Sequence, residues 1–397
     1  MGYIILIDMV NGLFLMQDFA LPISQGIKFI LLLLFLVRLS PTGDFTFAIL
    51  LIVFFQLSPV AGLIRNGDFS AYFGDVVFAA KWINVPLSYL YFKCLFQSAY
   101  ADTIQSSIKR MVGRNFIFLC VNMALGALGL GMSFYFHGYA NAVGTKGFIY
   151  AGNELTILVL SLHFIIGSYW YYKQEYRKYL GLFLVFLAIS FLITSKTVLI
   201  GVLVVGAIPI IASLRQRIHK KWINRISALV LFGTPIFLAL IYLGVTRSGV
   251  IDKIQYSLER NNFDLLTVVL SNRNRFVAEG WDVFSRDFSW FGQLFGFGQH
   301  HHLYLSGHSA EVDFFTILFA SGLLGLLFLL ILLLFWLLNA QKLMKTSGYV
   351  LAKNTWLFLL FLILVANLAG HIFGSGIAGI FIGLSIALMH FKPVSHG

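Results

Sequence analysis

Residues 313–338 read DFFTILFASGLLGLLFLLILLLFWLL, and this run decides the fold. No charged residue follows Asp313 within it. A helix needs about 20 consecutive apolar residues to cross a bilayer. Because hydrocarbon offers no partner to backbone N–H and C=O groups, such a run predicts a membrane-spanning helix.

The composition of the whole 397-residue chain is as apolar as a membrane protein requires. Hydrophobic residues make up 59% of the chain and charged residues 11%, whereas an ordinary soluble domain has roughly 25% charged residues. These values exclude a soluble globular protein, a disordered chain and a disulfide scaffold. A membrane β-barrel would alternate apolar and polar residues in segments of about ten, and the sequence lacks that pattern.

We predict an all-α, polytopic membrane protein with about 12 transmembrane helices, or about 11 if the short first segment lies in the interface. The predicted spans are 3–16, 23–39, 45–64, 72–99, 115–136, 151–172, 179–194, 196–214, 226–245, 313–338, 355–374 and 376–391.

Basic residues indicate the orientation of these spans. The net charge of +12 comes largely from gaps that follow even-numbered spans. Cytoplasmic loops collect Lys and Arg, so both termini are expected in the cytoplasm, and a nucleic-acid partner is not. The residues concerned are Lys109, Arg110, Arg114, Lys173, Arg177, Lys178, Arg215, Arg217, Lys220, Lys221, Arg225, Lys342, Lys345, Lys353 and Lys392.

The predicted spans divide the chain into three parts. Residues 1–245 hold spans one to nine, residues 246–312 form one long outer loop, and residues 313–397 hold spans ten to twelve. Long ordered loops are commonly functional, so we expect the loop to carry the site.

The outer loop ends in a histidine followed by two acids. Neutral imidazole accepts a proton near pH 7, which makes His308 the candidate general base. In a starting helix Glu311 would lie on the same face and orient it, with Asp313 as the other candidate. The alternative is that both acids only favour a helix start. His300–His302 are expected to be solvated or structural, because three adjacent histidines cannot all face one pocket. A metal site is the alternative, although the usual spacing of metal ligands is missing.

Basic residues on the outer side form a second group of candidates. Lys196 lies between two apolar spans with almost no loop, Arg247 follows the ninth span, and Arg273 and Arg275 lie in the long loop. Guanidinium groups bind phosphate oxygens in pairs and Lys binds them as a point charge. Such a group on the outer face suits a pyrophosphate. The alternative is contact with lipid headgroups.

A short outer segment adds an amide and a carboxylate, Asn153 and Glu154. The alternative for Asn153 is that it caps the sixth span.

The order of these motifs resembles the integral membrane glycosyltransferases of the O-antigen polymerase (Wzy) and O-antigen ligase (WaaL) type. No single motif is specific, but their order and the topology together are. Thr-Ser-Lys-Thr departs from the family's usual Ser-Arg, so the lysine keeps the charge and loses the paired geometry. Either Arg273 or Arg275 matches the family arginine. The matching elements are 152–154, 194–197, 271–273, Trp281, 296–298, His308, 311–313 and 322–325.

The resemblance implies an inverting, metal-independent glycosyl transfer without a cofactor, on the periplasmic side of a bacterial inner membrane. Donor and acceptor would be oligosaccharides linked to undecaprenyl pyrophosphate, and a chain-length regulator is a further candidate partner. Lys196, Arg247, Arg273 and Arg275 would bind the pyrophosphate, and His308 with Glu311 or Asp313 would take the proton from the acceptor hydroxyl.

Three other functions compete with a polymerase. A ligase would transfer finished glycan to lipid A-core with the same chemistry. A flippase or other transporter of lipid-linked glycan would place charges deep in its spans. A non-catalytic scaffold would leave Lys196 and His308 without a purpose.

Overall fold

The computed structural model describes the chain except residues 20, 136–142, 214–254, 256–257 and 393–397. Each predicted span within the described residues overlaps a helix, whereas span 226–245 lies outside them. The span helices are α1 (Ile4–Met16), α2 (Ile23–Leu39), α3 (Asp44–Asn66), α4 (Phe69–Phe96), α5 (Ala101–Ala127), α6 (Gly152–Tyr172), α7 (Tyr176–Ile193), α8 (Lys196–Ser213), α15 (Asp313–Leu343), α16 (Ala352–Leu368) and α17 (Gly379–Ala387), which continues as the 3-10 helix η1 (Leu388–His390).

The described helices support a membrane protein. Among them, α3, α6, α7, α8 and α15 are long and apolar enough to cross a bilayer, and α1, α16 and the α17–η1 segment are shorter apolar helices. The helical fold class is therefore confirmed, while the number of about 12 crossings stays a prediction.

Two predicted spans are partly wrong. Span 355–374 runs past α16, which ends at Leu368, and span 115–136 runs past α5. Helix α5 ends at Ala127, and residues 132–135, expected inside span five, form strand β1 (Met132–Tyr135). This strand pairs antiparallel with β2 (Val143–Gly147). Gly129 and Gly131 have positive φ angles of 81° and 103°. This backbone conformation stops a helix, which explains why the apolar run does not continue as one.

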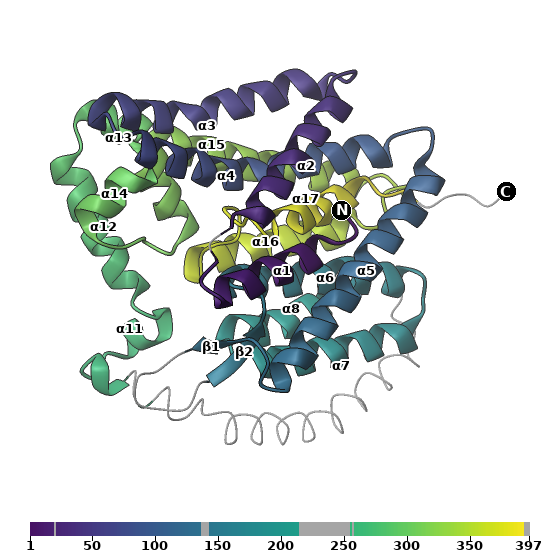
Figure 1. The fold of residues 1–397 in the computed structure, drawn as a ribbon. Coiled ribbons are helices and arrows are strands. Elements are labelled where there is room, and N and C mark those ends of the chain that lie inside the picture. Colours follow the sequence, from purple (N-terminus) through teal and green to yellow (C-terminus); the bar gives the residue numbers. More distant parts are fainter. Residues whose placement is uncertain (20, 136–142, 214–254, 256–257, 393–397) are drawn as a thin grey trace.

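The second half of α4 forms the centre of the core. Nine consecutive residues from Trp82 to Leu90 are buried, and α17 packs along them. Gly379 and Gly383 allow this approach, because a Cβ atom at either position would lie 2.4–2.5 Å from the Asn84 or Ser88 side chain. In Figure 1, α16 and α17 lie between the layer of α3, α4 and α15 and the group of α5 to α8.

Four short helices make up most of residues 265–306 of the long loop. They are α11 (Leu265–Leu270), α12 (Arg273–Asp287), α13 (Trp290–Phe295) and α14 (Gly298–Ser306). Figure 1 shows them stacked along one end of the helix bundle. α13 and α14 contact α3 and α15, and α14 also contacts α4. Helices α12 to α14 thus form a packed layer on the bundle.

Glycines allow this layer to approach the bundle closely. Helix α15 is kinked at Gly322, which has a positive φ of 68°. A Cβ atom there would lie 2.4 Å from the Leu294 carbonyl oxygen. A Cβ atom at Gly298 would lie 1.9 Å from the Asp75 carboxylate. That carboxylate accepts the His300 N–H at 2.8 Å, and Ser58 Oγ accepts the Gly298 N–H at 2.9 Å.

Replacing Gly322 with alanine is expected to loosen this contact. The added methyl group meets backbone that cannot rotate away, and the left-handed conformation disfavours any side chain. We expect a destabilisation of about 2 kcal/mol or more, seen as a lower melting temperature of the detergent-purified chain. Gly74→Ala is the matched control, because nothing lies within 4 Å of a Cβ atom there. Equal melting temperatures for the two variants would contradict the close-contact interpretation.

Candidate functional site

Two side-chain contacts align the end of the long loop with helix α12. His308 Nε2 lies 2.5 Å from Glu279 Oε2, and an Arg273 guanidinium nitrogen lies 3.3 Å from Glu311 Oε2. Arg273 Nε also donates to the Glu311 carbonyl oxygen at 3.1 Å. Arg273 and Glu279 are six residues apart, about 9 Å along the helix axis. Residues 308–311 therefore run antiparallel along α12.

The predicted partner of His308 is wrong. Glu311 does not begin a helix with His308, since α15 starts at Asp313 and Glu311 has a positive φ of 53°. The imidazole contacts Glu279, which lies 29 residues earlier in the sequence. No local spacing rule reaches across that separation, so the sequence analysis missed Glu279.

His308 and Glu279 differ in their access to solvent. The Glu279 side chain is 53% exposed and the His308 side chain 24%. The His308 ring packs against Phe276, with centroids 4.5 Å apart, and its Nδ1 is buried without a partner among the described residues. Of this pair, the carboxylate is therefore the group most open to an incoming molecule.

Asp313 performs a structural task. It is 2% exposed, and its Oδ2 accepts the N–H groups of Ile372 and Phe373 at 2.9 and 2.7 Å. The carboxylate thereby joins the start of α15 to the segment before α17. The expectation that it orients His308 is wrong, because its acceptor atoms point to this backbone.

Lys196 and Arg273 form a cationic group at this end of the bundle. Lys196 is exposed at the first position of α8, and its Nζ donates to the Val268 carbonyl oxygen at 3.2 Å. Arg273 donates to the Leu270 carbonyl oxygen at 3.3 Å, so both cations are anchored to the end of the same short helix, α11. Tyr135 of strand β1 also feels the Arg273 charge and bonds to Ser195.

The two arginines of the long loop differ in exposure and in partners. Arg273 is 13% exposed and faces Glu311, whereas Arg275 is exposed and interacts with the charge of Asp264, the cap of α11. The structure brings Arg273 to Lys196 and leaves Arg275 outside the group. Arg247 lies outside the described residues.

Two of the three adjacent histidines are buried and structural, whereas the His300 side chain is exposed. His302 is 3% exposed and stacks on Phe319 with centroids 4.7 Å apart. Burial lowers the pKa of His302 to about 4, so this imidazole is neutral near pH 7. His301 packs against Phe288 and Phe297, and burial lowers its pKa as well. In the described part of the chain, no three His, Cys, Asp or Glu side chains converge as metal ligands.

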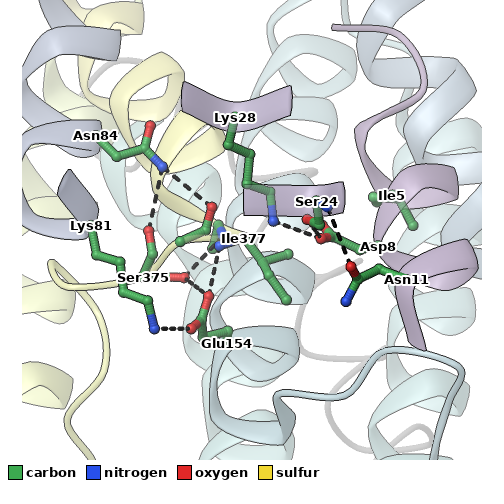
Figure 2. A network of polar contacts seen from close by, with 12 residues as sticks. Ile5, Asp8, Asn11, Ser24, Lys28, Lys81, Asn84, Glu154, Ser375 and Ile377 are labelled. Carbon is green, nitrogen blue, oxygen red and sulfur yellow. Dashed lines mark hydrogen bonds and ion pairs between the residues drawn. The ribbon is translucent and has the colours of Figure 1, made fainter. Parts of the chain in front are cut away.

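Glu154 lies in a separate polar network, shown in Figure 2. Its Oε2 accepts the Ile377 N–H at 2.6 Å and the Ser375 hydroxyl at 3.1 Å. Its Oε1 lies 3.6 Å from Lys81 Nζ. Asn153 is exposed and does not cap α6, whose N-cap is Ala151.

Figure 2 also shows an ion pair that is largely buried. Lys28 Nζ lies 2.6 Å from Asp8 Oδ1, and that carboxylate also accepts the Ser24 hydroxyl. Lys28 acts on the charge of Glu154 too. The sequence analysis missed Asp8, Lys28 and Lys81. The available signal was a charged residue inside an apolar segment, which is rare unless the residue has a partner or a function.

None of the known families, curated proteins or solved structures with which the chain was compared matches it.

Removing the Asp313 carboxylate is expected to destabilise the packing of residues 371–373 against the start of α15. Asp313→Ala leaves two buried N–H groups without an acceptor, at a cost of about 1–3 kcal/mol for each. Asp313→Asn keeps one carbonyl acceptor and should lose less. The check is the melting temperature of each purified variant. An alanine variant that melts with the wild-type chain would contradict the structural role.

Proposed function

We propose that this chain is a polysaccharide polymerase of the bacterial inner membrane, which joins glycan repeat units linked to undecaprenyl pyrophosphate on the periplasmic side. One observation carries the proposal: α12 carries Glu279, which contacts His308, and Arg273, which lies about 9 Å along the helix axis. Arg273 and Lys196 both donate to carbonyl oxygens at the end of α11. A proton acceptor and a cationic group at this separation suit the two ends of a glycosyl transfer.

The chemistry assigns one role to each group. Lys196 and Arg273 bind the pyrophosphate and stabilise its charge as it leaves. The acceptor hydroxyl attacks the anomeric carbon from the opposite side and forms the new glycosidic bond. The bond from that carbon to the pyrophosphate oxygen breaks, and its electron pair leaves with the pyrophosphate. The His308–Glu279 pair takes the hydroxyl proton, with Glu279 as the more accessible member.

Arg273 already has an acidic partner before a substrate binds. Its guanidinium group contacts the Glu311 carboxylate at 3.3 Å, so a pyrophosphate must displace or share this partner. The Glu311 backbone carbonyl keeps the arginine in place meanwhile. Glu311 is thus a positioning residue in the proposal, and not a proton acceptor.

A ligase that transfers glycan to lipid A-core would use the same groups and is the nearest alternative. A transporter of lipid-linked glycan is favoured by one specific observation. The pairs Asp8–Lys28 and Lys81–Glu154 lie among α1, α2, α4 and α6, and charges within spans are typical of transport pathways.

Surface and lipid-linked glycans from cells that lack the chain test the proposal. A polymerase predicts that the glycan ladder disappears and that single repeat units cap the lipid A-core. Bare core together with long chains stranded on undecaprenyl pyrophosphate would indicate the ligase. Single units that stay on the cytoplasmic side of the membrane would indicate the transporter.

Variants returned to these cells test the assigned residues. We expect His308→Ala to lower turnover by about 10²–10⁴-fold, with Glu279→Gln in the same direction. Arg273→Ala should weaken donor binding and the rate, whereas Arg275→Ala is the matched control and should keep both. A ladder of normal length and amount from a well-expressed His308→Ala chain would remove the pair from the mechanism.

A further inference from the structure

Lys81 lies at the border between the exposed and the enclosed part of α4. The side chain is 41% exposed, whereas the nine residues that follow it are buried. It contacts Glu154, the third residue of α6. Placing an ammonium group in a helix of this kind costs free energy unless the group is paired or serves a function.

The pairing of Lys81 is weak by comparison with two other lysines. Lys93, in the same helix, lies 2.9 Å from both carboxylate oxygens of Asp44. Lys28 lies 2.6 Å from Asp8. Lys81 Nζ lies 3.6 Å from Glu154, beyond the usual hydrogen-bond range of about 2.7–3.2 Å. None of the described residues accepts a hydrogen bond from it.

Glu154 is already engaged by other groups. One of its oxygens accepts Ile377 N–H and the Ser375 hydroxyl, which leaves only the other for Lys81. Figure 2 shows the Lys81 ammonium group at the end of the network, with Glu154 as its one drawn partner. The carboxylate therefore positions Lys81 and offsets part of its charge, while N–H donors remain for a ligand.

The packing of α6 against α8 places Lys81 at the level of the cationic group. Gly201, five residues after Lys196, contacts Leu160, six residues after Glu154. The starts of these neighbouring helices are therefore at nearly the same level, and packed helix axes lie about 8–10 Å apart. Lys81 borders the start of α6, and Lys196 is the start of α8.

A β-strand joins the two places as well. A Cβ atom at Gly152, where α6 begins, would lie 3.0 Å from the ring of Phe134. Its neighbour Tyr135 bonds to Ser195 and feels the charge of Arg273. Strand β1 therefore contacts both the start of α6, which Lys81 borders, and Ser195, which directly precedes Lys196.

We infer that Lys81 binds a phosphate group of a lipid-linked pyrophosphate, with Glu154 as its positioning residue. A lysine ammonium group binds phosphate oxygens as a point charge, and a pyrophosphate carries enough oxygens to contact Lys81 as well as Lys196 and Arg273. The ligand class rests on the proposed function, but the inference concerns binding and requires no bond formation.

Binding of undecaprenyl pyrophosphate to the purified full chain tests the inference. We expect Lys81→Gln to weaken this binding by about tenfold and to leave binding of undecaprenol, which lacks the phosphates, unchanged. Lys81→Arg should keep most of the affinity. Lys93→Gln is the matched control on the same helix and should bind normally. A folded Lys81→Gln chain with wild-type affinity for the pyrophosphate lipid would overturn the inference.

A second measurement needs no variant. Acetylation of the wild-type chain by a lysine-specific reagent, followed by mass spectrometry, should show that undecaprenyl pyrophosphate protects Lys81 and not Lys93. Modification of Lys81 at an unchanged rate would overturn the inference. Equal protection by inorganic pyrophosphate would keep Lys81 as a phosphate ligand and overturn the lipid as the source of the phosphate.

These outcomes are separable from those of the glycan gel. A chain that forms no glycosidic bond but loses lipid binding in Lys81→Gln would refute the polymerase and support the binding site. A chain that polymerises glycan and binds the lipid equally well without Lys81 would support the polymerase and refute the binding role of Lys81.

Discussion

The close contact between the loop layer and the helix bundle is the constraint on which the proposed site depends. Backbone at Leu294 approaches the kink at Gly322 to a distance that leaves no room for a side chain. Asp75 and Ser58 then fix the start of α14 through its own N–H groups. Because the close contact at Gly322 and the two hydrogen bonds involve three different helices, α15, α4 and α3, they fix the position of α13 and α14 on the bundle. Helix α12 packs on α14 and α15, so its position is fixed by the same contacts.

Two kinds of polar contact serve different purposes at this end of the chain. Asp313 and Glu154 both accept backbone N–H groups from the segment that precedes α17, so they hold the architecture. His308, Glu279 and Arg273 make contacts between side chains that remain partly exposed. Such contacts can rearrange without breaking the backbone hydrogen bonds beneath them. This division separates a rigid support from groups that are free to meet a substrate.

The sequence predicted the helices well and the site only in part. Apolar runs of about 20 residues predict helices from local sequence alone, and the described helices lie within or near these runs. Strand β1 was missed because the sequence stays apolar on both sides of Gly129 and Gly131. The positive φ angles of these glycines end the helix, and hydropathy alone does not show them. The His308–Glu279 and Lys81–Glu154 contacts join residues far apart in the chain. Only tertiary packing creates such pairs, so residue spacing along one segment does not reveal them.

The contact between Arg273 and Glu311 has a consequence for selectivity. The protein supplies its own carboxylate to a guanidinium group that is 13% exposed, so the arginine already has an anion before any ligand arrives. A singly charged ion such as chloride or acetate gains little by replacing that carboxylate. A ligand with several negative charges can contact the arginine and neighbouring cations together, and the sum of these contacts exceeds the one lost. The internal carboxylate thus acts as a threshold that favours multivalent anions over the simple salts of the surrounding solution.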